Sequence, residues 1–202
     1  MTTPEPFVTP EEYLARERAA ETRSEYFGGR VYAMSGAGRQ HERIGFALAG
    51  ILHRQLAGGS CEGFVANMRT KVRANGLYTY PDVVVTCGEA EMEDERDDTL
   101  LNPTLIVEIL SPSTAAYDRG RKFALYRALD TLRTYVLVAQ DQPYVEVFER
   151  DGDRWILTEV SGLGATHDLP TLGARVPLRE LYARVEWPEN PPLRVVREDA
   201  LV

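Results

Sequence analysis

The sequence has no long apolar run, few cysteines and no leader-like N-terminus. A membrane-spanning helix needs about 20 consecutive apolar residues, and no run in the 202 residues approaches that length. Residues 1–6 have neither the basic start nor the apolar stretch of a signal peptide. The two cysteines, Cys61 and Cys87, lack a short metal-ligand spacing and allow one disulfide at most. We therefore expect a cytoplasmic protein with free thiols.

An excess of positive charge is also missing. The formal net charge is −8 at pH 7, whereas domains that bind nucleic acid usually carry a basic surface. Much of the negative charge lies in residues 89–98, where seven acidic side chains accompany one arginine. A run of this kind is typical of a solvated loop. Beside a groove that binds nucleic acid, this run would oppose binding.

Length and hydrophobic pattern predict the fold class. A chain of 202 residues with 44% hydrophobic content suits one domain over residues 1–202, with its core at about 10–185 and an extended, proline-rich tail at 187–202. Apolar periodicity and turn residues predict an α/β (α+β) fold with a central mixed sheet flanked by helices. Helices are expected at about 10–20, 39–56, 118–126 and 176–185, a hairpin at 25–35, and strands at 64–67, 69–73, 80–86, 105–110, 134–139, 144–148 and 155–160.

Two apolar strands in the middle of the chain each carry one carboxylate. Asp82 begins the first strand, and Glu108 lies inside the second, which has the continuous apolar composition of a strand buried on both faces. Burying one unpaired ion costs several kcal/mol. Glu108 therefore requires a cation, hydrogen-bond donors or a proton, and a metal ion shared with Asp82 would meet that requirement.

The segment after the second strand adds a cation. It contains Asp118, Lys122 and Tyr126, which lie four residues apart and share one face of a helix. An Asp118–Lys122 contact could orient the lysine or could be a simple surface ion pair, and the spacing favours neither.

A basic stripe is predicted upstream of these strands. Arg69, Lys71 and Arg73 alternate along a strand and so share one of its faces. Two interpretations are equally supported: a solvated edge, or a nucleic-acid-binding stripe that contacts phosphates beside the carboxylates.

Taken together, these motifs resemble a known family. The pattern of Pro81-Asp82, then Glu108 in an apolar strand, then Ser111-Pro112-Ser113-Thr114 with Asp118 and Lys122, resembles the Uma2 family, also called DUF820. That family belongs to the PD-(D/E)XK nuclease superfamily. The resemblance extends upstream to Glu25 and His41 and downstream to residues 135–138, and covers roughly residues 10–182.

The resemblance implies a restriction-endonuclease-like core and a metal-dependent endonuclease that hydrolyses phosphodiester bonds of DNA. It implies Mg²⁺ or Mn²⁺ as cofactor, bound by Asp82, Glu108 and the backbone carbonyl of Ile109. The catalytic residues implied are Asp82, Glu108, Lys122, Glu25 and His41. The resemblance also implies a homodimer, although no sequence feature locates an interface.

One departure from the superfamily pattern leaves alternatives open. The usual lysine two positions after the second acid is replaced by Leu110, and the resemblance suggests that Lys122 takes its place. If it does not, the chain is an inactive nuclease-fold module that binds nucleic acid or protein. A glycosidase with two carboxylates leaves Lys122 unexplained, and a serine hydrolase lacks the nucleophile-elbow sequence.

Overall fold

A six-stranded mixed sheet forms the centre of the fold in the computed structural model, which describes residues 7–187. The strand order is β11-β10-β9-β8-β6-β3. Neighbours β8 and β9 are parallel, and the other neighbours are antiparallel. All residues of β8 and β9 are buried, as their continuous apolar composition predicts. The bounds are β3 Cys61–Val65, β6 Val83–Cys87, β8 Leu105–Leu110, β9 Thr134–Ala139, β10 Tyr144–Asp151 and β11 Arg154–Ser161.

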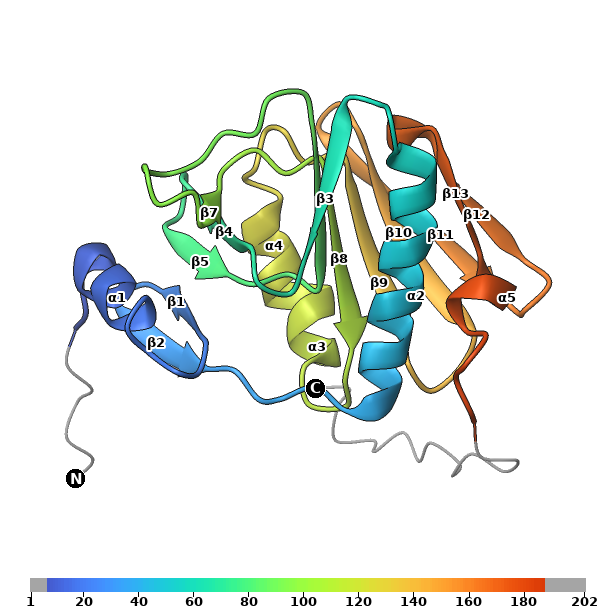
Figure 1. Cartoon of the computed structure of the whole chain (residues 1–202), viewed down its shortest axis with the longest axis horizontal. Helices are drawn as coiled ribbons and strands as arrows, with labels where there is room; N and C mark the ends of the chain where they lie inside the picture. The colour runs from blue at the N-terminus through green and yellow to red at the C-terminus, as the bar shows by residue number, and fades with distance from the viewer. Residues whose placement is uncertain (1–6, 188–202) are drawn as a thin grey trace.

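Helix α2 (Arg39–Leu56) covers one face of this sheet, as Figure 1 shows. Its apolar stripe, which includes Ile44, Leu48 and Leu52, packs on Val107 and Val136 of the strands. The predicted bounds of this helix are confirmed. Apolar periodicity fixes the buried face of α2, and its first turn lies close to the start of β6.

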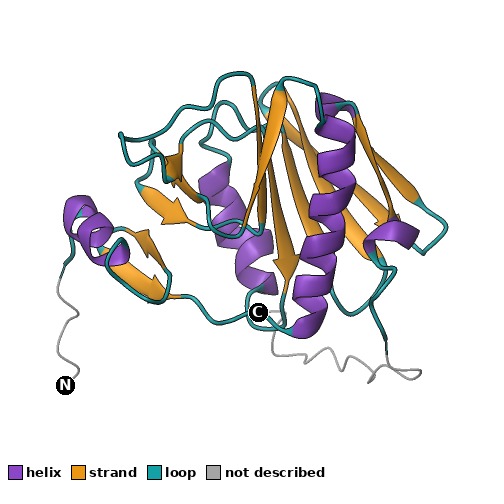
Figure 2. Cartoon of the chain, viewed as in Figure 1, coloured by secondary structure: helices purple, strands orange, loops and turns teal. Residues whose placement is uncertain are grey.

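The opposite face carries a helical segment of three parts, α3 (Ala115–Tyr117), η1 (Asp118–Lys122) and α4 (Phe123–Tyr126). Figure 2 shows helices on both sides of the central strands. Phe123 stacks on Tyr135 of β9, with ring centroids 4.8 Å apart. The prediction of one regular helix here is wrong in one respect, because η1 is a π-helical turn.

The N-terminal hairpin belongs to a second sheet, which has five strands. Its order is β2-β1-β5-β4-β7, with bounds β1 Ser24–Phe27, β2 Arg30–Ala33, β4 Arg69–Val72, β5 Leu77–Thr79 and β7 Thr99–Leu100. Helix α1 (Pro10–Glu17) packs on one face through Tyr13, which stacks on Tyr26. The predicted start of α1 is confirmed, since Thr9 and Glu12 form a capping box.

The C-terminal part departs from the predicted helix at 176–185. Strands β12 (Thr166–Leu169) and β13 (Ala174–Pro177) form a separate pair, joined by the short helix η2 (Pro170–Leu172), and only α5 (Leu178–Leu181) is helical. Val176 pairs with His167, so its backbone extends instead of coiling. Apart from Trp187, the predicted tail lies outside the described residues. Within residues 7–187, no helix has the length and apolarity needed to cross a membrane.

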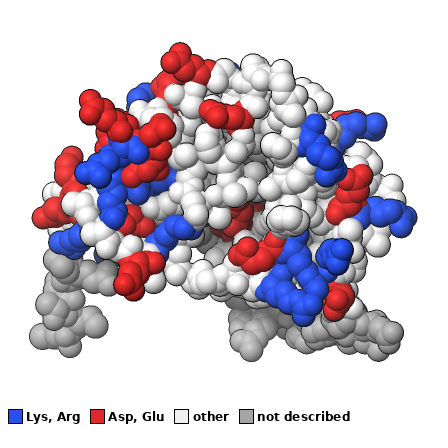
Figure 3. Space-filling model, in the orientation of Figure 1, with Lys and Arg blue, Asp and Glu red and all other residues white. Residues whose placement is uncertain are grey.

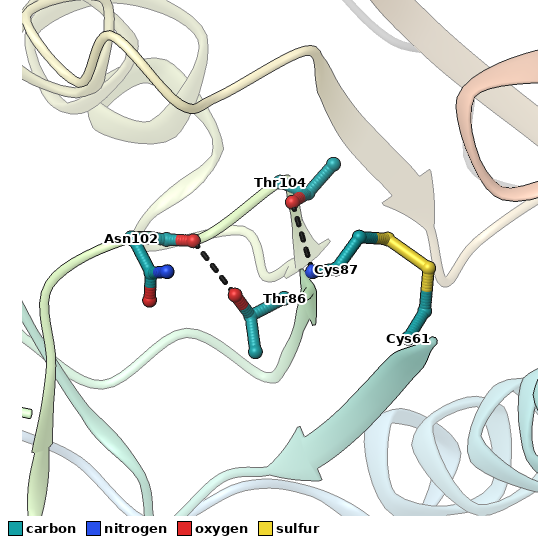
Figure 4. Close-up of a disulfide and its surroundings, with 5 residues drawn as sticks. All are labelled: Cys61, Thr86, Cys87, Asn102 and Thr104. Carbon is teal, nitrogen blue, oxygen red and sulfur yellow. Dashed lines mark hydrogen bonds between the residues drawn. A yellow bond between two sulfur atoms is a disulfide. The ribbon is translucent and has the colours of Figure 1, made fainter. Parts of the chain in front are cut away.

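The cysteines also differ from expectation, because Cys61 and Cys87 form a disulfide. The two residues lie directly opposite each other on antiparallel β3 and β6, and this register brings their sulfurs together. The prediction of free thiols is therefore wrong. Figure 4 shows the backbone N–H of Cys87 donating to Thr104 Oγ1 at 3.1 Å, which ties this end of β6 to the segment before β8.

Candidate active site

A buried lysine lies between the buried Glu108 and the partly buried Glu25. Nζ of Lys122 is 2.9 Å from Oε1 of Glu108 and 2.9 Å from Oε1 of Glu25. Glu108 belongs to β8, Glu25 to β1 and Lys122 to η1, so three elements distant in sequence converge here. Both Glu108 and Lys122 are 5% exposed. The structure thus brings together three of the residues that the resemblance implied.

The π-helical turn contributes a fourth group. Asp118 and Lys122 begin and end η1, both are buried, and Asp118 Oδ1 is 3.9 Å from the lysine nitrogen. Tyr135 donates to the backbone carbonyl of Asp118 at 3.0 Å, so a core side chain satisfies a backbone group of this turn. π-Helical turns are rare and often occur at functional sites. The Asp118–Lys122 contact is a buried one, not the surface ion pair of the alternative interpretation.

The cluster holds more negative than positive groups. Burial raises the pKa of Glu108 to about 8, because Lys122 only partly offsets the loss of solvation and the nearby carboxylates add to it. Burial opposes the charge on Lys122, but Glu108, Glu25 and Asp118 together raise the pKa of the lysine well above its usual value. One ammonium group thus serves three carboxyl groups. A second cation at this site would be favoured electrostatically.

Asp82 lies beside this cluster, immediately before β6. Its Oδ2 accepts a hydrogen bond from the backbone N–H of Ile109 at 2.6 Å, and its Oδ1 is 2.9 Å from Nε2 of His41. Burial opposes protonation of His41, but the hydrogen bond and charge of Asp82 outweigh it and raise the pKa of His41 above its usual value. His41, in the first turn of α2, thus contacts Asp82. Asp82 in turn is hydrogen-bonded to β8, the strand that carries Glu108.

Two hydroxyl groups complete the cluster. Thr79 donates to Oε1 of Glu25 at 2.5 Å, and Tyr126 donates to Oε1 of Glu108 at 2.8 Å. Tyr126 shares its helical face with Lys122, but no function was predicted for it from the sequence. Thr79 had no signal at all, because a threonine in a strand is an ordinary residue.

The predicted basic stripe faces away from this cluster. Thr79 on β5 points toward Glu25, whereas its neighbour Tyr78 lies opposite Lys71 in the sheet and packs with Tyr13 of α1. Side chains alternate between the faces of a strand. Lys71 and its stripe partners therefore lie on the α1 side of the second sheet.

The stripe is paired with the acidic segment 89–98. Arg69 is 4% exposed, donates to Thr99 Oγ1 at 3.0 Å, and has Asp98 3.5 Å away. Lys71 pairs with Glu93, and the members of a further exposed pair, Arg73 and Glu91, lie 3.4 Å apart. Figure 3 shows the resulting interleaved acidic and basic side chains over the second sheet. The segment is largely an exposed loop, as expected, and several of its carboxylates pair with the stripe. Phosphate binding by the stripe stays a prediction.

The residues present offer oxygen donors of the kind that divalent cations bind. Asp82 and Glu108 offer hard oxygen donors, and Mg²⁺ is commonly held by one or two carboxylates together with waters and substrate phosphates. Within residues 7–187, no three His, Cys, Asp or Glu side chains form a ready-made metal cluster. The excess of carboxyl groups around Lys122 supports a cation at this place.

Comparisons with known proteins agree with this fold. Residues 10–179 match the family described as "Uma2: Putative restriction endonuclease". The uncharacterized protein sll1609 of Synechocystis is 37% identical over 78% of this chain and 90% of its own length. A second uncharacterized Synechocystis protein, slr1290, is 38% identical over 76% of this chain and 80% of its own.

A solved structure shows the same architecture. It is a crystal structure titled as a putative nuclease belonging to DUF820, from Anabaena variabilis. It superposes with a TM-score of 0.72 over 87% of this chain and 98% of its own, at 18% identity. At that identity the match establishes a shared fold alone.

Proposed function

This chain belongs to the Uma2 family, and from that premise we propose that it is a Mg²⁺- or Mn²⁺-dependent endonuclease that hydrolyses phosphodiester bonds of DNA. The observation that supports this most is the buried contact of Lys122 with Glu108, beside Asp82. Burying several carboxyl groups around one ammonium costs stability, and such clusters with perturbed pKa values occur mainly at functional sites.

Five residues of the site have a defined task in this proposal. Asp82 and Glu108 would hold the divalent cation, with the carbonyl of Ile109 as a further oxygen donor. When bound, the cation would activate water for attack on phosphorus and neutralise charge on the phosphate oxygens. His41 orients Asp82 through their 2.9 Å contact. The ammonium of Lys122 stabilises the additional negative charge of the transition state.

A second candidate function is an inactive nuclease-fold module that binds nucleic acid or protein. Leu110, at the usual lysine position, is buried at 5% exposure and packs in the apolar cluster around Phe123. The acidic segment 89–98 also neutralises the basic stripe. Neither observation changes the buried contact between Lys122 and Glu108, so we favour the enzyme.

The decisive experiment is cleavage of supercoiled plasmid with Mn²⁺, with Mg²⁺ and with a chelator. We expect the wild type to nick or linearise the plasmid only with metal, and Asp82→Asn to lose this activity. Asp153→Asn is the matched control, because Asp153 is exposed in the turn between β10 and β11. Metal-independent nicking, or equal loss in the control, would contradict the proposal. Plasmid binding without cleavage would support the module instead.

Assembly into a homodimer remains part of the proposal. Two sites related by a two-fold axis would cut both strands of a duplex. Light scattering at micromolar concentration should give twice the monomer mass, and a monomer mass would refute the dimer.

A further inference from the structure

We propose that Tyr126 and Thr79 are positioning residues. With Lys122, their hydroxyl groups bind Oε1 of Glu108 and of Glu25. They leave Oε2 of each glutamate for a divalent cation, which adds Glu25 to the ligands Asp82, Glu108 and Ile109 of the proposed function. This inference rests on the proposed metal-dependent nuclease function. It assigns a task to two residues that lie outside the set implied by the family resemblance.

The donors form a closed ring. Lys122 contacts Oε1 of both glutamates at 2.9 Å, Tyr126 donates to the same atom of Glu108 at 2.8 Å, and Thr79 to the same atom of Glu25 at 2.5 Å. The two hydroxyl hydrogen bonds to these carboxylates and the closest approach of the Lys122 ammonium to each of them all fall on Oε1. Oε1 is therefore the oxygen that these donors occupy on both glutamates.

When both glutamates are ionised, as they would be with a cation bound, each hydroxyl donates to its own glutamate. Each hydroxyl has one proton to donate. Tyr126 gives its proton to Glu108 and Thr79 gives its own to Glu25, so their mutual contact of 3.4 Å is a weak one. Removing either hydroxyl leaves the corresponding carboxylate with Lys122 as its remaining partner in the ring.

The surroundings hold the hydroxyls rigidly. Tyr126 and Thr79 are both 0% exposed, and the ring of Tyr126 lies 5.6 Å from that of Tyr135. Hydrogen bonds to charged groups are stronger than those between neutral groups. Residues that orient metal-binding groups typically change metal affinity or activity by about 10–100-fold when substituted.

The chain offers matched controls for both hydroxyls. Tyr182 is buried, and its hydroxyl donates to the backbone carbonyl of Ala139 at 2.9 Å, away from the cluster. Thr70 lies opposite Thr79 in the strand register and is buried, and its hydroxyl has no partner within the described residues. Tyr182→Phe and Thr70→Val thus remove the same atoms without touching a glutamate.

The test measures Mn²⁺ binding by calorimetry and plasmid cleavage on Tyr126→Phe, Thr79→Val and the two controls. We expect Tyr126→Phe and Thr79→Val to raise the Kd for Mn²⁺ about tenfold and lower kcat about 10–100-fold, with KM for DNA changed less than twofold. Tyr182→Phe and Thr70→Val should stay within twofold of wild type in all three quantities.

The outcomes separate this inference from the proposed function. A wild type that neither binds Mn²⁺ nor cleaves DNA overturns both. An active wild type whose Tyr126→Phe and Thr79→Val variants match their controls overturns the positioning role alone. Because either substitution could weaken folding, circular dichroism accompanies the assays. If one variant does not fold, the comparison of the other variant with its control decides whether the hydroxyl groups have a positioning role.

Discussion

Nζ of Lys122 lies 2.9 Å from Oε1 of Glu108, although one residue belongs to a π-helical turn and the other to a central strand. The position two residues after Glu108 holds the buried Leu110. The cation therefore comes from the helical segment that packs on the sheet. This contact is the geometric basis of the proposed activity.

Replacing the lysine tests that contact directly. Breaking a buried ion pair by removing one partner costs about 3–5 kcal/mol, because a charge is left buried without compensation. We expect Lys122→Met to lower the free energy of unfolding by about that amount and to reduce plasmid cleavage by orders of magnitude. Urea unfolding and cleavage rates measure the two effects.

Lys71→Met is the control for this prediction. Lys71 pairs with Glu93 on the other side of the second sheet and is partly exposed, so its removal should cost about 1 kcal/mol or less. It should leave kcat unchanged, and any loss of phosphate binding by the stripe should raise KM alone. If Lys122→Met resembles Lys71→Met in both measurements, Lys122 has no catalytic task.

The His41–Asp82 contact makes a prediction about protonation. The pKa of His41 is raised, since the hydrogen bond and charge of Asp82 outweigh burial, whereas burial lowers the pKa of His167. NMR titration of the imidazole protons should show His41 above and His167 below the usual value. Asp82→Asn should lower the pKa of His41 and leave that of His167 in place.

The sign of the stability effect follows from the direction of this shift. A group whose pKa is raised on folding stabilises the protein fully below its unfolded pKa, and loses this contribution as pH rises through the folded pKa. The stability difference between wild type and His41→Gln should therefore shrink as pH rises through and above the folded pKa of His41. A difference that grows with pH would contradict the assignment.

Sequence reasoning predicted the elements whose hydrophobic pattern is strong. The bounds of α2 and of β8 and β9 match the prediction, because an apolar stripe or a continuous apolar run reports burial directly. The pairing of β12 with β13 was missed, since Val176 reads equally well as part of a short amphipathic helix. The disulfide was missed because it depends on the register of β3 against β6.

The candidate site was predictable only in part. Buried charge in an apolar strand drew attention to Glu108, and the family resemblance supplied Lys122, Glu25 and His41. The hydroxyl of Thr79 contacts Glu25 because β1 and β5, which are distant in sequence, are neighbouring strands of the second sheet, and no local pattern encodes that pairing. The pairing of Lys71 with Glu93 is likewise set by how segment 89–98 folds back over β4.

The acidic segment makes a prediction about acid stability. Arg18 of the N-terminal region contacts Asp98 at 2.8 Å, and this hydrogen bond is the main cause of the lowered pKa of Asp98. A lowered pKa stabilises the folded state above the unfolded pKa, and the contribution is lost as pH falls through the folded value. Arg18→Gln should therefore lower the Tm at neutral pH by about 2 °C.

The difference between wild type and Arg18→Gln should disappear as pH falls below the ordinary carboxyl range. Arg16→Gln is the control, because Arg16 is exposed on α1 and should leave the Tm unchanged at every pH. Thermal unfolding followed by circular dichroism over a pH series provides the measurement. A constant difference at all pH values would mean that Asp98 is not the partner.

The disulfide makes the last prediction. Cys61 and Cys87 are 26 residues apart, and in the chain-entropy description a cross-link closing a loop of that size stabilises the folded state by roughly 3.5 kcal/mol. Reduction, or the double substitution Cys61→Ser with Cys87→Ser, should therefore lower the Tm by about 7–14 °C. Thiol titration of the denatured protein should detect no free thiol before reduction and two afterwards.

The same bond should be dispensable for cleavage. Cys87 ends β6, whereas Asp82 immediately precedes the first residue of that strand, and the ladder between β3 and β6 continues from Cys61 to Val65 without the sulfurs. At a temperature where both forms are folded, the reduced protein should cut plasmid at the rate of the oxidised one. Loss of cleavage on reduction, with the Tm unchanged, would show that the bond acts on the site and not on stability.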